Sequence, residues 1–331
     1  MESLTSAPRN VITDRGDAGR RLDLVLRRHL ADAGAATRTQ IQGWIESGRV
    51  SVNGRAVWRA AARAKPGDVV TVAIPVSAQL RPMSAEDVPL AVLYEDDHLL
   101  AINKPSGIVV HPTYRHTNGT LMNGLLWRAR AWPGGQRPSL VGRLDKLTSG
   151  LIIVAKTAAL HAALQRVMAS ACSAKDYLAV VYGRVPMAHG TIALRLALDP
   201  GNRRRVVASA AHGAASLTRF ERLARVAAPG AGLSLLRCRL VTGRRHQIRV
   251  HLAASGWPLV GDPTYGEPRW TKVTDPGLAA TLSAFPRQAL HAWRAAFVHP
   301  VLREPVVIEA PVPEDLAALI NSAGLRLGRS A

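Results

Sequence analysis

The stretch GRLDKLTSGLIIVAK at residues 142–156 joins a polar loop to a wholly apolar segment, Leu151–Ala155. A short apolar run bounded by a turn signal predicts a buried strand. Asp145 lies in the loop, with Arg143 and Lys146 close by in sequence. Because nearby positive charge favours an ionised carboxylate, Asp145 is a candidate nucleophile or base. The loop alone also fits an ordinary surface ion pair, which is common and weak.

A second polar loop, TGRRHQIRVH at residues 242–251, follows the strand-like run at residues 233–241. It predicts a helix that continues to about residue 255, on which Arg245 and Arg249 lie one turn apart on one face. Two arginines near a helix start are electrostatically unfavourable unless an anion faces them. A phosphate or a carboxylate would meet that need, and a solvated basic face is the alternative.

Two further places carry cations that suit contact with nucleic acid. Lys175 and Tyr177 lie on the same face of an expected strand, and an aromatic ring beside a cation suits stacking on a base. A tyrosine at such a position is otherwise a core residue. In NKPSG at residues 103–107, Lys104 precedes a turn signal and is a candidate phosphate contact.

The sequence predicts no metal site and no cofactor. His246 and His251 are five residues apart, not the four of a helical zinc pair. Cys172 and Cys238 provide neither a disulfide framework nor a four-ligand zinc set. The sequence also contains no GxxxxGK[ST] phosphate loop, no GxSxG elbow and no HExxH motif.

The 331 residues suffice for two domains. Leucines recurring every four residues from Leu22 predict one helix, and Ile41, Trp44 and Ile45 share a face of a second. The turn Asn53-Gly54 then joins strands of a small antiparallel sheet. We therefore expect a disordered arm at residues 1–16, a small domain at 17–75, a proline-containing linker at 76–90 and a second domain at 91–331.

The second domain mixes strands and helices without a regular βαβ rhythm, which is typical of an α+β fold with a mostly antiparallel sheet. A helix is expected over residues 158–168. Strands are expected at residues 92–94, 99–103, 151–155, 177–182 and 233–241.

The chain carries 43 Lys plus Arg against 23 Asp plus Glu, a net charge of +20. Such an excess indicates a polyanionic partner, although an Arg-rich composition can also reflect the base composition of a genome. The start MESLTSAPRN lacks the apolar core of a signal peptide, and no run approaches the roughly 20 apolar residues of a membrane helix. We expect a cytoplasmic monomer that binds nucleic acid and no membrane.

In this order, the motifs of the second domain resemble those of the RluA-type family of RNA pseudouridine synthases. The resemblance covers about residues 91–315. Its carriers are NKPSGIVVHP (103–112), GRLDKLTSGLIIVAK (142–156), KDYLAVVYG (175–183), TGRRHQIRVHLAASGWPLVGDPTYG (242–266) and LHA (290–292).

The resemblance implies the roles of individual residues. Asp145 matches the catalytic aspartate, and Arg143 matches the arginine that fills the space left by a flipped base. Tyr177 matches an active-site tyrosine that stacks on the base and is placed to help proton transfer. Arg249 matches the arginine that pairs with the catalytic carboxylate. Gly142 departs from the family, which usually has histidine there, and so does Arg245, which replaces a frequent threonine.

The segment TRTQIQGWIESGRVSVNGRAV (37–57) resembles a small RNA-binding domain that is named after a small-subunit ribosomal protein and also occurs in tyrosyl-tRNA synthetases. The two-domain order resembles family members that modify large-subunit ribosomal RNA. The expected RNA-binding residues are Arg143, Lys104, Lys175, Arg244, Arg245, His246, Gln247, Arg38, Arg49 and Arg55.

The expected activity is therefore isomerisation of specific uridines in a structured RNA, most simply large-subunit ribosomal RNA. The reaction has no redox change, which agrees with the missing cofactor motifs. Attack on the sugar, attack on the base and removal of a sugar proton remain open as routes for Asp145. The alternatives are a transfer RNA pseudouridine synthase and a non-catalytic ribosome-assembly factor of the same fold. A methyltransferase would need a glycine-rich loop between a strand and a helix, which the sequence lacks.

Overall fold

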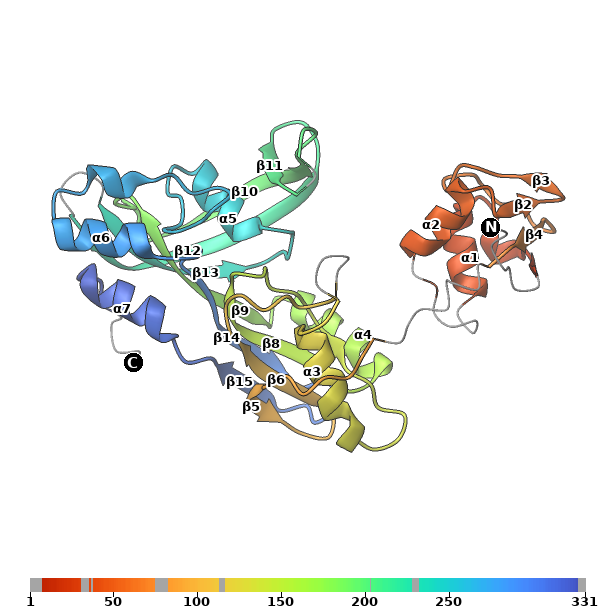
Figure 1. The fold of residues 1–331 in the computed structure, drawn as a ribbon, viewed down its shortest axis with the longest axis horizontal. Coiled ribbons are helices and arrows are strands. Elements are labelled where there is room, and N and C mark those ends of the chain that lie inside the picture. Colours follow the sequence, from red (N-terminus) through yellow and green to blue (C-terminus); the bar gives the residue numbers. More distant parts are fainter. Residues whose placement is uncertain are drawn as a thin grey trace. The chain divides into compact units, whose positions relative to one another are not determined.

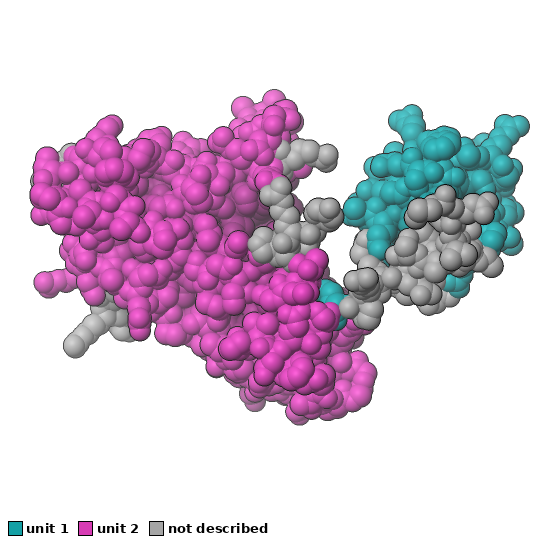
Figure 2. Space-filling view, viewed as in Figure 1, with its two compact units in different colours: residues 1–83 teal, residues 84–331 magenta. Residues whose placement is uncertain are grey.

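A computed structural model describes residues 8–30, 36, 38–74, 83–112, 117–202, 204–227 and 232–326. The chain divides into two compact units, residues 1–83 (unit 1) and 84–331 (unit 2), which Figure 2 shows in different colours. Within the described ranges, no helix is long and apolar enough to cross a membrane.

In its described residues, unit 1 combines two α-helices with a four-stranded antiparallel sheet in the order β1-β4-β2-β3 (Figure 1). The predicted helices are confirmed, and so is the turn, where Asn53 and Gly54 both have positive φ. Leu22, Leu26 and Ile41 are almost completely buried between helices and sheet. The elements are α1 (Leu22–His29), α2 (Arg38–Glu46), β1 (Arg9–Ile12), β2 (Val50–Val52), β3 (Arg55–Ala56) and β4 (Val69–Val72).

The expectation of a disordered arm at residues 1–16 is wrong for its described part. Strand β1 pairs with β4 along its whole length, and Val11 is buried in the core of unit 1. Asp14 and Asp17 then form ion pairs with Arg28 on α1. The polar sequence around β1 concealed a short edge strand that only its partner strand completes. Residues 1–7 lie outside the described residues.

Unit 2 contains one large sheet with the order β11-β10-β12-β13-β9-β14-β8-β6-β5, to which β7 and β15 are added beside β8 and β14. Of the pairings between its described strands, β14 with β8 is parallel and the others are antiparallel. The predicted mostly antiparallel α+β fold is confirmed. The strands are β5 (Ala91–Glu95), β6 (Leu99–Lys104), β7 (Ser139–Leu140), β8 (Ser149–Ala155), β9 (Ala174–Tyr182), β10 (His189–Leu198), β11 (Val206–Ser209), β12 (Ala214–Val226), β13 (Leu233–Leu240), β14 (Leu290–Val298) and β15 (Pro305–Glu309).

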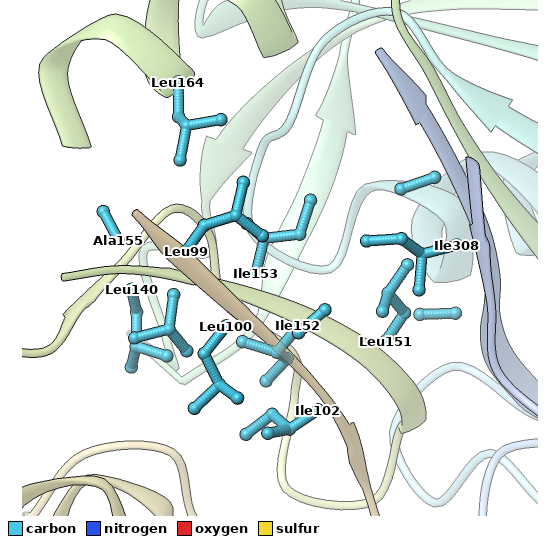
Figure 3. Close-up of a cluster of buried hydrophobic side chains, with 14 of the residues drawn as sticks. Leu99, Leu100, Ile102, Leu140, Leu151, Ile152, Ile153, Ala155, Leu164 and Ile308 are labelled. Atoms are coloured by element: carbon cyan, nitrogen blue, oxygen red, sulfur yellow. The ribbon is translucent and has the colours of Figure 1, made fainter. Parts of the chain in front are cut away.

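Helices cover this sheet at several places. The strand β8 is buried over its whole length, which explains why its residues are apolar without alternation. Leu164 of α4, Leu99 of β6 and Ile153 of β8 belong to one cluster of buried side chains (Figure 3). Burying each such side chain stabilises the fold by about 1.5–3 kcal/mol. The helices are α3 (Leu121–Arg128), α4 (Ala158–Ala169), α5 (Gln247–Ala254), α6 (Pro276–Ala284) and α7 (Glu314–Ser322).

A glycine allows β8 and β14 to approach each other closely. Gly150 has φ +111°, and a Cβ atom there would lie 2.2 Å from the carbonyl oxygen of Ala292. Neither the backbone conformation nor the space suits a larger residue. Gly150 thus fixes the end of the Asp145 loop against β14.

The predicted linker at residues 76–90 is wrong for residues 84–90, which belong to unit 2 and contact α3. The side-chain amide of Asn123 on α3 donates to the carbonyl oxygen of Ser84 at 2.7 Å, and its backbone carbonyl accepts from the N–H of Glu86 at 3.1 Å. The Glu86 carboxylate also accepts from the N–H of Gly119 at 2.7 Å. Prolines prevent strand pairing here but not an extended segment held by side chains. Residues 76–82 lie outside the described residues.

Candidate active site

Asp145 lies in the loop that connects β7 to β8. The neighbouring Leu144 is buried in the core, so the chain alternates inward and outward, and Asp145 lines a cleft. The N–H of Thr148 donates to the carbonyl oxygen of Asp145 at 3.1 Å, which closes a tight turn. The loop therefore presents the carboxylate from a fixed backbone.

Lys104 holds the backbone of the Asp145 loop in place. Its side chain is fully buried, and its Nζ donates to the carbonyl oxygens of Pro105, Ile108 and Lys146 at 2.7, 3.2 and 3.1 Å. Burial lowers the pKa of Lys104 to about 8, and the charge of Arg287 acts in the same direction. The prediction that Lys104 contacts phosphate is wrong, because its ammonium group is used inside the protein.

Polar side chains from β14 and the segment before it hold the other end of the loop. The amide of Gln288 donates to the Thr148 hydroxyl at 3.0 Å, and the Ser149 hydroxyl lies 2.9 Å from Nδ1 of His291. All four of these residues are buried. Buried polar groups in such a connected network fix one backbone position because any other leaves them unpaired.

Arg249 on α5 contacts the Asp145 carboxylate directly. Its Nη1 donates to Oδ2 of Asp145 at 2.8 Å, so the expected pairing of these two side chains is present. Its Nε and Nη2 donate to the two carboxylate oxygens of Asp262, each at 2.7 Å. The side chains of Arg249 and Asp262 are 6% and 1% exposed. A bidentate pair of this kind holds the guanidinium plane rigidly.

The charged side chains of Arg249, Asp262 and Asp145 stabilise one another. Burial opposes the charge on Arg249, but the hydrogen bonds and charges of Asp262 and Asp145 outweigh it and raise the pKa of Arg249. Burial likewise opposes the charge on Asp262, but Arg249 and the N–H groups of Thr264 and Tyr265 lower the pKa of Asp262. A buried arginine with two carboxylates is thus kept charged beside the cleft.

Asp262 is a site residue that the sequence reasoning missed. It lies in the GDPTYG segment, in which Gly261 has φ +68° and a Cβ there would lie 2.1 Å from the carbonyl oxygen of Arg287. The available signal was an aspartate in a Gly-Asp-Pro turn shortly after a helix with a buried arginine. That signal does not identify its partner, because the fold alone brings the turn back to α5.

The cleft around Asp145 has a volume of about 660 Å³, within the range of pockets that hold a small molecule or a flipped base. Tyr177 lines it from β9, and burial and the charge of Asp145 raise the pKa of its phenol. The phenol therefore stays protonated near neutral pH. The cations that line it include Arg143, Lys175, Arg244 and Arg245, in addition to Arg249 and Arg294. Of these, Arg143, Arg244 and Arg245 are exposed.

The segment before α5 differs from the prediction. The helix begins at Gln247, and His246 before it has φ 55°, so Arg245 and Arg249 do not share a helical face. The unfavourable pair of helix-start arginines does not arise, and Asp145 and Asp262 are the anions that face Arg249. Ile248 and Leu252 are buried in the core.

Gln247 is a predicted RNA contact whose side-chain amide is bonded within the protein, and its contact with RNA stays a prediction. It is buried, its Oε1 accepts from the Thr242 hydroxyl at 2.8 Å, and its Nε2 donates to the carbonyl oxygen of Leu217 at 3.0 Å and to Thr218 at 2.9 Å. Its amide instead joins the start of α5 to β12. His246 lies beside Asp145, with its Nε2 3.7 Å from Oδ1 of the carboxylate.

The other predicted RNA-binding residues belong to unit 1. Arg38 donates to the buried carboxylate of Asp23 at 2.9 Å, so part of its charge is already paired. Arg49 is half-buried and Arg55 is exposed. Their contact with RNA stays a prediction.

Within the described ranges, the cluster with the chemistry of metal ligands is Asp14, Asp17 and His29 in unit 1. Arg28 pairs with both of these aspartates at 2.9 Å. These carboxylates already have a cation, and the cluster acts as an ion-pair network.

Comparison with known proteins agrees with this geometry. A family model described as RNA pseudouridylate synthase matches residues 98–254, and a model described as S4 domain matches residues 20–70. A ribosomal large subunit pseudouridine synthase D of Xanthomonas campestris is 38% identical over 97% of this chain and 94% of its own length. An uncharacterized RNA pseudouridine synthase of Bacillus subtilis is 41% identical over 86% of this chain and 89% of its own.

Among solved structures, human RNA Pseudouridylate Synthase Domain Containing 1 is 26% identical, with a TM-score of 0.54 over 72% of this chain and 89% of its own. The match to the Xanthomonas campestris relative spans almost the whole of both units. The chain belongs to the RNA pseudouridine synthases, a family of isomerases.

Proposed function

We propose that Asp145 is the catalytic carboxylate of this enzyme and that the substrate is a uridine in structured large-subunit ribosomal RNA. The observation that carries the proposal is the ion pair between Asp145 and Arg249, whose guanidinium is fixed by the buried Asp262. A carboxylate held by a rigid cation beside an open cleft needs little reorganisation when charge changes during a reaction.

The reaction breaks the bond between N1 of uracil and C1′ of the ribose and forms a bond between C5 and C1′. The proton on C5 leaves, and N1 gains a proton. The base must first leave its stack, which costs a few kcal/mol unless it is already unpaired. The exposed guanidinium of Arg143 at the cleft offsets part of this cost by stacking in the gap. Tyr177 offers its ring for stacking and its phenol for a hydrogen bond.

The choice of ribosomal RNA rests on the names of relatives and on the S4 match in unit 1. Transfer RNA is the alternative substrate. We expect the enzyme to act as a cytoplasmic monomer, because the residues that hold the Asp145 carboxylate all come from one chain. Mapping pseudouridines in ribosomal and transfer RNA from cells with and without the gene decides between the substrates. A lost site in transfer RNA alone would contradict ribosomal specificity.

The catalytic role of Asp145 is tested by tritium release from RNA labelled at C5 of uridine. Asp145→Asn keeps the shape of the side chain and removes its charge. We expect no release from this variant, with RNA affinity retained. Asp97→Asn, at an exposed position of unit 2, is the matched control and should release tritium normally. Undiminished release by Asp145→Asn would end the assignment. Absence of release from the wild-type protein on every RNA would support the non-catalytic alternative.

A further inference from the structure

The hydroxyl group of Tyr265 joins the ring of His246 to a strand of the large sheet. Its oxygen lies 2.8 Å from the backbone nitrogen of Val206, at the start of β11, and 2.8 Å from Nδ1 of His246. The rings of His246 and Tyr265 pack edge to face at 5.7 Å. Neither contact was expected from the sequence.

The chemistry of these groups determines which atom carries which proton. A backbone N–H can only donate, so the Tyr265 oxygen accepts from Val206. With the Val206 N–H directed at the oxygen, the arrangement in which the hydroxyl proton is also used has Nδ1 of His246 as its acceptor, and Nδ1 is then unprotonated. In the neutral ring the proton is therefore on Nε2. In this arrangement the backbone proton of Val206 and the hydroxyl proton of Tyr265 each have an acceptor.

The Nε2 atom faces the catalytic carboxylate. It lies 3.7 Å from Oδ1 of Asp145, whereas Arg249 binds Oδ2 at 2.8 Å. The two carboxylate oxygens are thus different: Oδ2 is bound by a fixed cation, and Oδ1 faces a neutral N–H just beyond hydrogen-bond distance. A protonated ring would place a second full cation on the carboxylate, which would compete with the substrate for it.

The backbone conformation of His246 indicates that the fold holds this residue in one position. His246 has φ 55° and ψ 18°, a left-handed conformation that costs of order 1–3 kcal/mol for a residue other than glycine. Its side chain is 13% exposed. Burial lowers the pKa of His246, with Arg249 and Arg245 acting in the same direction against the carboxylates of Asp145 and Asp262. The fold thus favours the neutral ring that the hydrogen bonds require.

Tyr265 also contacts the cation that binds Asp145. The guanidinium of Arg249 lies 5.0 Å from the centre of the Tyr265 ring, and the guanidinium of Arg205 lies 5.8 Å from it. The backbone N–H of Tyr265 donates to Asp262 at 3.1 Å. One side chain therefore touches both groups that flank the carboxylate.

We propose that His246 is a positioning residue for the Asp145 carboxylate, and that Tyr265 holds it as the neutral tautomer with the proton on Nε2. In this arrangement Oδ1 is the reacting oxygen, and the Nε2–H group orients it as the base enters the cleft. The proposal deepens the assigned role of Asp145 and rests on it. It concerns the position of the carboxylate and not the affinity for RNA.

The tautomer is measured by nitrogen NMR on full-length protein labelled with ¹⁵N-histidine. The signals missing from His246→Asn identify the ring among the 11 histidines. We expect an unprotonated Nδ1 and a protonated Nε2 in the wild type, and mixed tautomers in Tyr265→Phe. A protonated Nδ1 in the wild type, or an unchanged spectrum in Tyr265→Phe, would overturn the proposal. This readout needs no activity, so it fails or succeeds independently of the Asp145 assignment.

Single-turnover tritium release supplies the functional readout. We expect Tyr265→Phe and His246→Ala each to slow release by about tenfold, with RNA Kd unchanged in Tyr265→Phe. His246→Gln restores an N–H donor near the Nε2 position and should recover most of the rate. Tyr94→Phe, which removes a hydroxyl bonded to Asp96 away from the cleft, should behave as wild type. A wild-type rate in both Tyr265→Phe and His246→Ala would refute the positioning role. Equal losses in His246→Gln and His246→Ala would refute the role of the N–H donor.

Discussion

The buried charged groups beneath Asp145 differ from the exposed cations around the cleft. Arg249, Asp262 and Lys104 are at most 6% exposed, and their donors and acceptors are used by other parts of the protein. Arg143 and Arg244 are exposed on the same cleft. The same residue types therefore have two uses: the buried group holds the Asp145 carboxylate, and we expect the exposed group to contact RNA phosphates and bases.

The largest effect is expected at Arg249. Arg249→Met leaves Asp145 and Asp262 without their cation, and breaking a buried pair costs about 3–5 kcal/mol of unfolding free energy. Tritium release should fall by about a hundredfold or more, because the carboxylate loses its fixed partner. Urea unfolding and the release assay measure the two losses. Arg166→Met, at an exposed position on α4, is the control. An unchanged unfolding free energy would show that the buried charges do not support one another.

A smaller effect on stability is expected at Gly150. Gly150→Ala places a Cβ atom 2.2 Å from the carbonyl oxygen of Ala292, at a backbone φ of +111°. We expect a loss of about 2–4 kcal/mol, measured by urea unfolding. Gly142→Ala is the matched control in the same loop, because a Cβ there meets no atom within 4 Å. Equal stabilities would contradict the close approach of β8 and β14.

Substitution of Lys104 distinguishes most directly between a cation that stabilises the fold and a cation that contacts RNA. Lys104→Met removes the donor to three backbone carbonyl groups, so we expect a loss of about 1–3 kcal/mol in unfolding free energy. The salt dependence of RNA binding should not change. The exposed Lys272 provides Lys272→Met as a control for stability. A lower salt slope in Lys104→Met would return Lys104 to the residues that contact phosphate.

The smallest effect on stability is expected among the exposed cations. Arg244→Ala should change the unfolding free energy by no more than about 0.5 kcal/mol. If Arg244 neutralises one phosphate, the slope of log affinity against log salt should become shallower by about 1. Filter binding to ribosomal RNA fragments over a series of salt concentrations measures this slope. An unchanged slope combined with lost stability would place Arg244 with the buried groups.

The sequence predicted features whose signals are local. The apolar run Leu151–Ala155 and the turn Asn53-Gly54 each carry their own signal, and both are confirmed. The strands β10, β11 and β12 were not predicted, because partly exposed residues interrupt their alternation. The edge strand β1 needed its partner to be recognised.

The site residues also divide into those that carry a local sequence signal and those that only the fold brings together. Asp145 was found from its motif, and its pairing with Arg249 was expected from the resemblance alone, since the two residues are 104 positions apart. Lys104 and Gln247 were assigned to RNA from their residue types and motifs. The sequence does not show that the fold buries both side chains. Asp262 and Tyr265 act through other side chains, so residue type and spacing gave them no distinct signal.

The place of β14 in the sheet has a consequence for synthesis of the protein. This strand lies between β9 and β8, although it follows them by more than a hundred residues in the chain. During translation, the Asp145 loop therefore leaves the ribosome long before the strand that holds it, and a chain truncated before Leu290 lacks a central strand. The nascent chain therefore acquires the assembled Asp145 site only after residues 290–298 have been synthesised and inserted between β9 and β8.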